Sequence, residues 1–319
     1  STPDPSAQSA ATAAGTATGI PLAVPLSATQ KVADWQSLQF GLFMHWGVYS
    51  TYEGMYQGRP QRMGYPEQIK AWEKIPDSDY KAQAATMTAD KWDAANVCQT
   101  AKNTGMKYVM ITTKHHDGFA MWDTATTDYN FTKQSPSHRD PLLELSQACK
   151  QVGIKFGLYF SNIDWEKQPE NPWMNDNTLD EEGYMDYIHA QLKELLGGKY
   201  GDIAELWYDM GKPNPAQSDQ LRAWAHELQP DIMINSRVGN DRADFEVGWD
   251  NELQTEQTQG PWESAVSIFP KCWGYCEWDD AAPKFKDTGY PDYSEEDWDH
   301  MVDVDNETRL RKDTEGVAK

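Results

Sequence analysis

Basic residues are scarce in this sequence. Its 319 residues include 28 Lys and Arg against 50 Asp and Glu, which gives a formal net charge of −22. Nucleic-acid binding relies on Lys and Arg to neutralise phosphates, so this balance argues against a nucleic-acid partner. It argues equally against docking on an anionic membrane. Long apolar runs are also missing, since none approaches the ~20 residues that a membrane-spanning helix needs. We therefore expect neither nucleic-acid binding nor membrane insertion.

Cysteine is sparse as well, and the four present form no metal or redox motif. Cys98 and Cys149 fall on the apolar faces of predicted helices, where buried free thiols are expected. Cys272 and Cys276 lie four residues apart in KCWGYCEW, without the second pair of ligands that a zinc site would need. The cysteines thus predict no structural zinc.

Low complexity marks the start of the chain. Residues 1–29 are rich in Ala, Ser, Thr and Pro, and Asp4 is their only charged side chain. Such a composition cannot bury a core, so we expect a flexible segment here. It precedes a catalytic domain over 30–304 and a charged tail over 305–319. The chain starts at Ser1 without Met, which fits either removal of a signal peptide or artificial trimming of the sequence. From the first explanation we expect a secreted or periplasmic protein.

Short β-rich runs alternate with amphipathic helical stretches along the sequence. The predicted strands are residues 40–47, 108–113, 154–160, 203–209 and 232–238. The predicted helices are residues 88–103, 140–152, 180–196 and 216–228. The helix over 140–152 opens with Asp140 as its cap and Pro141 in its first turn. The strands are apolar nearly throughout, as parallel strands buried on both faces are.

Repeated β-then-α units leave two architectures, a (β/α)8 barrel or an open doubly wound sheet. No Gly-rich phosphate-binding loop follows any predicted strand. Polar and aromatic residues instead cluster at the carboxyl ends of several strands, where barrel enzymes build their sites. These residues are His45, Trp46, His115, His116, Asp117, Tyr159, Trp207, Tyr208, Asp209, Asn235, Ser236 and Arg237. The pattern favours an α/β fold of the (β/α)8 type.

An acid at the end of one strand is the first catalytic candidate. Asp209 closes the run IAELWYD, directly after two aromatic residues. There it would be partly desolvated and held in place, as a nucleophile or a base should be. The alternative is that Asp209 caps the helix that follows.

The adjacent histidines in TTKHHDGF leave three interpretations open. Side chains alternate along a strand, so we expect one of His115 and His116 to face the pocket while the other braces it from the loop. The imidazoles could hydrogen-bond sugar hydroxyls, bind backbone carbonyls as a structural pair, or hold a metal together with His45 or Asp117. The sequence has no His-x-x-x-His or similar paired spacing, which argues against the metal. The 14 Trp and 15 Tyr suit stacking on sugar rings.

A second carboxylate is needed if the protein cleaves a glycosidic bond, because one carboxylate attacks while another protonates the leaving oxygen. Candidates gather in residues 244–264, namely Glu246, Asp250, Glu252, Glu256 and Glu263. Taken alone, this stretch is equally well explained as a solvated acidic loop.

Six blocks of the sequence, in this order, resemble the α-L-fucosidases of glycoside hydrolase family 29: FGLFMHWGVYS, GYPEQIKAWEKIP, KYVMITTKHHDGFAMWDT, IKFGLYFSNIDW, ELWYDM and PWESAVSIF…CWGY. The resemblance runs from about residue 30 to 280, and HWG with KHHDGF is its most specific part. It implies a retaining exo-hydrolase that removes terminal α-L-fucose from fucosylated oligosaccharides or glycans through a covalent fucosyl-enzyme. It also implies that no metal or organic cofactor is needed.

Carried over block by block, the resemblance makes Asp209 the nucleophile. It implies that Trp207 lies against the sugar and that six residues hold the fucose hydroxyls: His45, Glu67, His115, His116, Tyr159 and Arg237. For the acid/base we predict Glu252, in the loop after the strand that ends near Arg237. Glu263 is its rival, and Glu246 and Glu256 rank lower as surface carboxylates.

The sequence departs from the family in two places. It has Glu67-Gln68 where many members have Glu-Trp. It also ends soon after a recognisable helical stretch over 292–304, so we expect a barrel incomplete at its C-terminal end and without the usual β-sandwich. Two other functions stay open: a non-catalytic fucose-binding protein of this fold, and an α-L-galactosidase-like relative whose substrate differs at the C6 position of the sugar.

Overall fold

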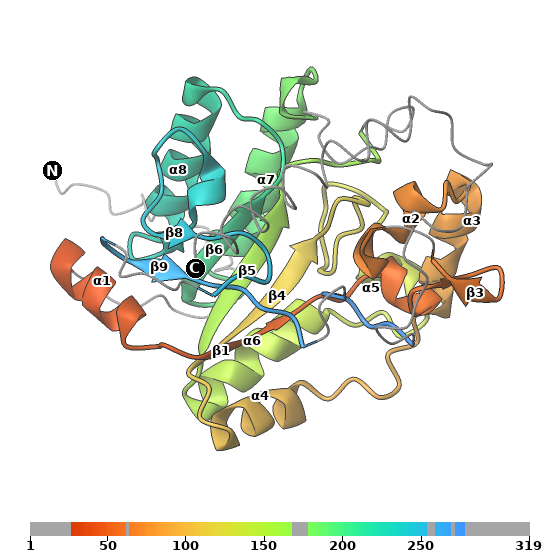
Figure 1. Cartoon of the computed structure of the whole chain (residues 1–319), viewed down its shortest axis with the longest axis horizontal. Helices are drawn as coiled ribbons and strands as arrows, with labels where there is room; N and C mark the ends of the chain where they lie inside the picture. The colour runs from red at the N-terminus through yellow and green to blue at the C-terminus, as the bar shows by residue number, and fades with distance from the viewer. Residues whose placement is uncertain (1–26, 62–63, 168–177, 254–258, 269–271, 278–319) are drawn as a thin grey trace, which may run out of the picture.

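A parallel β-sheet forms the centre of the protein. The structure, a computed structural model, describes residues 27–61, 64–167, 178–253, 259–268 and 272–277 (Figure 1). Within these ranges the main sheet has five strands in the order β1-β4-β5-β6-β7. They are β1 (Gly41–Met44), β4 (Tyr108–Lys114), β5 (Lys155–Ser161), β6 (Ile203–Asp209) and β7 (Met233–Ile234). All neighbouring pairs are parallel, as the sequence predicts.

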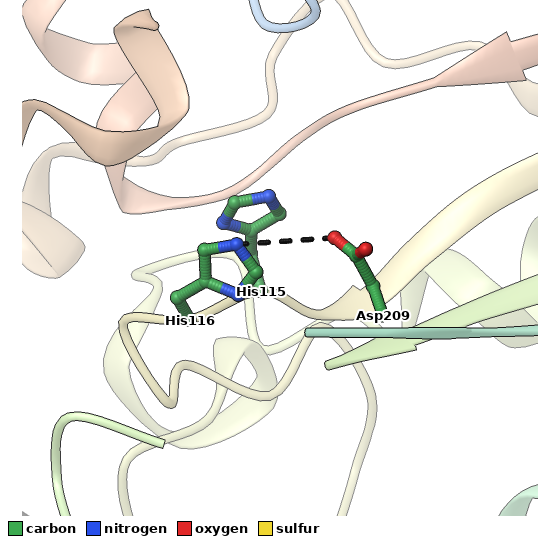
Figure 2. Close-up of side chains that lie close together, drawn as sticks. All are labelled: His115, His116 and Asp209. Carbon is green, nitrogen blue, oxygen red and sulfur yellow. Dashed lines mark ion pairs between the residues drawn. The ribbon is translucent and has the colours of Figure 1, made fainter. Parts of the chain in front are cut away.

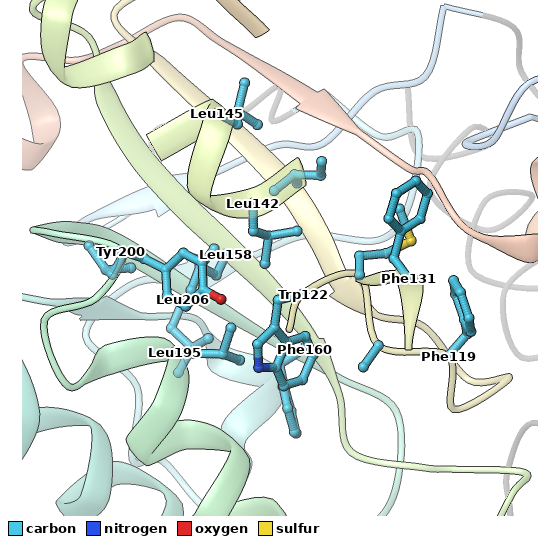
Figure 3. Packing of buried hydrophobic residues seen from close by; sticks show 14 of the residues in the cluster. Phe119, Trp122, Phe131, Leu142, Leu145, Leu158, Phe160, Leu195, Tyr200 and Leu206 are labelled. Atoms are coloured by element: carbon cyan, nitrogen blue, oxygen red, sulfur yellow. The ribbon is translucent and has the colours of Figure 1, made fainter. Parts of the chain in front are cut away.

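The four longest of the described α-helices pack on one face of this sheet. The α-helices are α1 (Ala28–Gln36), α2 (Ile69–Trp72), α3 (Asp77–Ala82), α4 (Ala94–Asn103), α5 (Phe131–Gln134), α6 (Pro141–Val152), α7 (Tyr184–Leu196) and α8 (Pro215–Leu228). Short 3₁₀ helices are η1 (Val48–Tyr52), η2 (Pro66–Gln68), η3 (Gln83–Thr86), η4 (Thr178–Asp180) and η5 (Ser236–Val238). Figure 3 shows the packing, in which Leu142 of α6 and Leu195 of α7 lie in one buried cluster with Leu158 and Leu206 of the strands. A second cluster, which includes Met110, Tyr159 and Trp207, fills the opposite face of the sheet.

Capping residues explain where the helices begin. The backbone N–H of Leu143 donates to Asp140, 3.0 Å away, so the cap predicted for α6 is confirmed. Two helices begin later than their periodicity predicts. Asp93 accepts from the N–H of Asn96 and starts α4 at Ala94 instead of 88, and α7 starts at Tyr184 instead of 180.

Two of the predicted strands are much shorter than expected. β1 covers only Gly41–Met44, and β7 ends at Ile234 instead of 238. The side chain of Asn235 explains the second difference, because its amide donates to the carbonyl of Tyr208 and accepts from the N–H of Tyr208, both at 2.9 Å. Beyond Asn235 the chain turns into η5.

Short strands continue the sheet beyond β7. Asn235 forms a parallel bridge with Phe245, which leads directly into β8 (Glu246–Val247). β8 in turn pairs in parallel with β9 (Trp262–Glu263). A separate antiparallel hairpin is formed by β2 (Met55–Tyr56) and β3 (Arg59–Pro60).

The N-terminal helix α1 packs against the second cluster, the one that contains Met110, Tyr159 and Trp207. Ser27 caps it with a reciprocal bond to Gln30, so the helix begins inside the segment 1–29 that the sequence predicts as flexible. The ring of Trp35 lies 4.5 Å from that of Phe245, and its indole N–H donates to Glu205 at 2.8 Å.

The cysteines divide into two pairs. Cys98 and Cys149 are buried free thiols as predicted, with their sulfur atoms 2.8 Å apart. Cys272 and Cys276 form a disulfide, which the sequence reasoning missed. The segments 1–26, 292–304 and 305–319 lie outside the described residues. Among those described, no helix is long and apolar enough to cross a membrane.

Candidate active site

Asp209 lies at the carboxyl end of β6 with only 7% of its surface exposed. Its carboxylate accepts a hydrogen bond from the Tyr159 hydroxyl and another from Arg237, each at 2.5 Å. Asn214 caps α8 and accepts from the N–H of Gln217, so the alternative that Asp209 is a helix cap is wrong. Asp209 is therefore held by groups that stabilise its negative charge.

Burial alone would raise the pKa of Asp209. Arg237, His116 and the hydrogen bond from Tyr159 outweigh this and lower the pKa below its ordinary value. The carboxylate is consequently ionised at neutral pH although it is desolvated. An ionised acid of this kind can act as a nucleophile.

Both histidines of the TTKHHDGF block face Asp209 (Figure 2). The prediction that they point in different directions is wrong, because β4 ends at Lys114 and the alternation of a strand no longer applies. Their ring centroids are 4.0 Å apart, and His116 Nε2 lies 3.9 Å from Asp209 Oδ2. His116 Nδ1 shares a hydrogen bond of 2.7 Å with the hydroxyl of Ser161, which pairs with Asp209 across β5 and β6.

His45 joins the same group from the end of β1. Its ring lies 5.5 Å from His115 and 5.4 Å from Tyr159. Within the described part of the chain, the buried Nδ1 atoms of His45 and His115 have no hydrogen-bond partner. The interpretation as a pair bound to backbone carbonyls therefore fails for His115, and these atoms can accept or donate a hydrogen bond to a ligand.

Burial lowers the pKa of His45 to about 3 and that of His116 to about 4, and it lowers the pKa of His115 well below its ordinary value. All three imidazoles are thus neutral at pH 7. A neutral imidazole has one donor and one acceptor, which matches a hydroxyl group. It is also the form that binds metals, and the ligand atoms of His115, His116 and Asp209 all lie within 4.8 Å of one another.

Glu67 reaches the site from η2 and is buried. Its carboxyl accepts the backbone N–H of Gly274 at 2.9 Å. Burial raises the pKa of Glu67 to about 8, so this carboxyl is protonated and can donate a hydrogen bond at neutral pH. Its neighbour Gln68 accepts from the indole of Trp72, and so the departure from the family's Glu-Trp places an amide against a core tryptophan.

The loop Cys272–Cys276 that supplies Gly274 is closed on itself by the disulfide. Its Trp273 ring lies 5.7 Å from His45. A Cβ on Gly274 would lie 3.1 Å from the Tyr49 ring and 3.5 Å from Glu67, so a larger residue would crowd this loop. Sequence reasoning did not place these residues at the site, because a lone pair of cysteines four apart is also compatible with free thiols.

Arg237 connects the nucleophile candidate with a second acid. One terminal nitrogen donates to Asp209 and the other to Asp250. The guanidinium lies 4.8 Å from the centre of the Trp207 ring, over its face. The structure thus joins Asp250 to the site, whereas sequence reasoning treated it as one of several loop acids.

The two acids predicted as acid/base lie in different surroundings. Glu252 is half-buried, and its backbone N–H donates to the carbonyl of Trp249 at 3.2 Å. Glu263 accepts the hydroxyl of Tyr108 at 2.7 Å and the indole N–H of Trp207 at 2.8 Å, so both of its oxygens are occupied. Glu246 is exposed on β8. Glu256 lies outside the described residues.

The fold and the site together define an α/β protein with a buried, ionised carboxylate and neutral imidazoles at the carboxyl ends of parallel strands. Comparison with known proteins makes the assignment specific. The model of the alpha-L-fucosidase family matches residues 18–288. The chain belongs to this family.

The curated relatives and the solved structures that resemble this chain are also alpha-L-fucosidases. The chain is 33% identical over 168 residues to Alpha-L-fucosidase 1 of Arabidopsis thaliana. The matched stretch covers 50% of this chain and 31% of that protein. The chain is 27% identical over 280 residues to the tissue alpha-L-fucosidase of Mus musculus, covering 76% and 59%. The chain thus spans about a third to three fifths of these curated relatives. Unliganded alpha-L-fucosidase AlfC from Lactobacillus casei is similar with a TM-score of 0.69 and 33% identity, covering 80% of this chain and 84% of that one.

Proposed function

We propose that this chain is a retaining α-L-fucosidase that removes terminal α-L-fucose from fucosylated oligosaccharides or glycans. The observation that carries the proposal is Asp209, buried and ionised between Arg237 and Tyr159 and faced by neutral imidazoles. Relatives support the substrate class, since AlfC structures are described in complex with an α-L-fucose product and with Fuca(1,6)GlcNAc.

In the first step, a carboxylate oxygen of Asp209 forms a bond to the anomeric carbon as the glycosidic C–O bond breaks. A second carboxyl gives its proton to the leaving oxygen. In the second step that carboxylate takes a proton from water, the water oxygen attacks the anomeric carbon, and Asp209 is released. Two displacements retain the configuration of the sugar.

The fucose hydroxyls would be bound by groups already placed around Asp209. His45, His115 and His116 offer neutral donor–acceptor rings, and Glu67 offers a protonated carboxyl. Tyr159 already donates to Asp209 and lies with its ring stacked on His115 at 5.4 Å. An apolar sugar face would lie near the Trp207 ring.

For the acid/base, the contacts favour Asp250 over the predicted Glu252. A retaining pair must lie about 5–5.5 Å apart. One guanidinium, that of Arg237, binds both Asp209 and Asp250, and this draws the two carboxylates together. Glu263 is the weaker rival because its oxygens already accept from Tyr108 and Trp207.

The architecture we propose is the (β/α)8 barrel, with a catalytic domain over 30–304 between the Ala/Ser/Thr/Pro-rich segment 1–29 and the charged segment 305–319. Its support is the parallel sheet and its continuation through the Asn235–Phe245 bridge into β8 and β9. The disulfide between Cys272 and Cys276 supports a secreted or periplasmic location, because disulfides persist in oxidising compartments.

The test is NMR of the first-formed sugar during hydrolysis of a panel of aryl and natural α-L-fucosides. We expect α-L-fucose as the first anomer, which reports retention. Folded protein that binds fucose tightly without cleaving any fucoside would instead identify a fucose-binding protein. Preferred cleavage of the α-L-galactoside would identify the relative that acts on that sugar.

A further inference from the structure

A chain of polar contacts runs beneath the proposed fucose site from α1 to Trp207. Trp35 donates its indole N–H to Glu205 at 2.8 Å, and the carboxyl groups of Glu205 and Glu263 lie close enough to interact. Glu263 in turn accepts the indole N–H of Trp207 at 2.8 Å. None of these four side chains except Trp207 is assigned a part in the reaction described above.

Where two buried carboxyl groups are neighbours with no cation between them, the pKa of one is strongly raised and that group keeps its proton. Trp35 satisfies Oε2 of Glu205, and among the described residues no N–H or O–H group reaches its Oε1. Glu263 receives two donors, from Tyr108 and Trp207, and so it is the better place for the negative charge. Burial and Glu263 raise the pKa of Glu205 well above its ordinary value, which places the proton on Glu205. The protonated Glu205 can then donate to the carboxylate of Glu263.

The position of Trp207 matters to the site because of what lies on its face. The guanidinium of Arg237 lies 4.8 Å from the centre of the indole ring, and the same guanidinium binds Asp209 and Asp250. A rotation of the Trp207 indole would therefore displace Arg237, and with it the two carboxylates that Arg237 binds. Cation–π contact with a desolvated indole also contributes to holding Arg237.

We propose that Glu263 is a positioning residue, which holds Trp207 through a proton-sharing pair with Glu205 and thereby orients Arg237 and the two carboxylates it binds. This assignment deepens the proposed fucosidase function and rests on it for its kinetic consequence. Glu263 acts through Trp207 and does not transfer a proton to the substrate. It follows that Glu263 needs only an acceptor oxygen toward the indole, not an ionisable group.

The first experiment observes the tryptophan indoles directly and does not depend on enzyme activity. Protein labelled with ¹⁵N at the tryptophan indoles is observed by NMR, with the Trp207 and Trp35 signals assigned from W207F and W35F. We expect Glu263→Ala to shift the Trp207 indole signal and speed its hydrogen exchange, and Glu263→Gln to leave it close to the native position. Glu246→Ala, a change of an exposed carboxylate in the neighbouring strand, is the matched control and should move neither signal. An unchanged Trp207 signal in folded Glu263→Ala would overturn the hydrogen bond on which the proposal rests.

The second experiment separates positioning from proton transfer. We expect Glu263→Ala to lower kcat/KM by roughly 10- to 100-fold, the effect of leaving a buried donor unpaired. The loss should be equal for nitrophenyl and natural leaving groups, with an unchanged pH profile, and Glu263→Gln should restore most of it. A Gln variant that is as impaired as Ala, with a larger loss on poor leaving groups and rescue by azide, would make Glu263 the acid/base and overturn the proposal.

The two experiments fail independently. If Glu263→Ala does not fold, Glu263→Gln still decides, because an acid/base residue would lose activity on poor leaving groups in that variant too. If the native protein hydrolyses no fucoside, the proposed function falls, while the indole signals still report whether Glu263 holds Trp207.

Discussion

Arg237 holds Asp209 and Asp250 at once, one carboxylate on each of its two terminal nitrogens. The two acids are 41 positions apart in the sequence, counting from 209 to 250, and Asp209 ends β6 whereas Asp250 lies in a turn after β8. The arrangement makes a single side chain responsible for the relative placement of the proposed nucleophile and the proposed proton donor.

Asp209→Asn should keep the fold and the affinity for fucose and abolish turnover, because the amide is not a nucleophile. A 2-fluoro-fucosyl fluoride should label the native protein within the peptide that contains LWYDM, as mass spectrometry of a digest would detect. Asp241→Asn, which changes an exposed aspartate, serves as the control. A label on any other acid would remove Asp209 from its role.

Asp250→Ala should slow hydrolysis of natural fucosides by roughly 10²–10⁴-fold, the usual contribution of a general acid. It should spare the first step with a nitrophenyl leaving group, which departs without protonation, and should flatten the basic limb of the pH profile. The same measurements on Glu252→Ala test the prediction made from the sequence. Whichever variant shows this pattern carries the acid/base, and the pattern in Glu252→Ala alone would return the role to Glu252.

Stability should respond to pH through Glu67. Its pKa is raised to about 8, so the folded protein favours the neutral carboxyl, and the wild type loses stability as pH rises from the ordinary Glu value of 4.5 toward 8. Glu67→Gln removes this loss. The difference in Tm between variant and wild type should therefore grow in favour of the variant between pH 5 and 8 and level off above pH 8. A difference that stays constant over this range would contradict a protonated Glu67.

His115→Ala should weaken fucose binding by about 3- to 10-fold, the worth of one hydrogen bond of about 1 kcal/mol. Chelation with EDTA should leave activity unchanged, although His115, His116 and Asp209 are close enough to bind a cation. Calorimetry and an aryl-fucoside assay would measure the two effects. Activity lost to EDTA and restored by zinc or manganese would establish a metal site instead.

Reduction of the disulfide between Cys272 and Cys276 should weaken fucose binding, because this loop gives the Gly274 N–H to Glu67 and places Trp273 beside His45. The double variant Cys272→Ser with Cys276→Ser should bind as weakly as the reduced protein. Adding reductant to this variant is the control for effects on Cys98 and Cys149. Equal fucose affinity in the oxidised and reduced wild type would sink the idea.

Local sequence patterns predicted the elements that depend on nearby residues. The apolar runs gave β4, β5 and β6 nearly to the residue, and Asp140 marked the start of α6 correctly. Periodicity could not place the end of β7, because that end depends on the Asn235 side chain bonding to a strand from another part of the chain.

Part of the site was predicted because its residues end a strand, whereas Glu67, which lies on η2, was predicted from the family resemblance alone. Asp209, His45 and the two histidines follow that rule, and the structure brings them together. Asp250 and Trp273 arrive on loops, whose paths are set by distant contacts such as those of Arg237 and of the disulfide. No pattern of neighbouring residues carries that information, and this is why Glu252 was predicted where Asp250 makes the contact.

The disulfide spans a sequence separation of only four. In the chain-entropy view, a cross-link stabilises a protein by restricting its unfolded chain, and the effect shrinks with the length of the loop that it closes. So small a ring removes little freedom from an unfolded chain of this length. Its effect is therefore confined to the folded state, where it limits the conformations open to five residues beside Glu67. Oxidation here changes the rigidity of one wall of the site far more than the melting temperature of the protein.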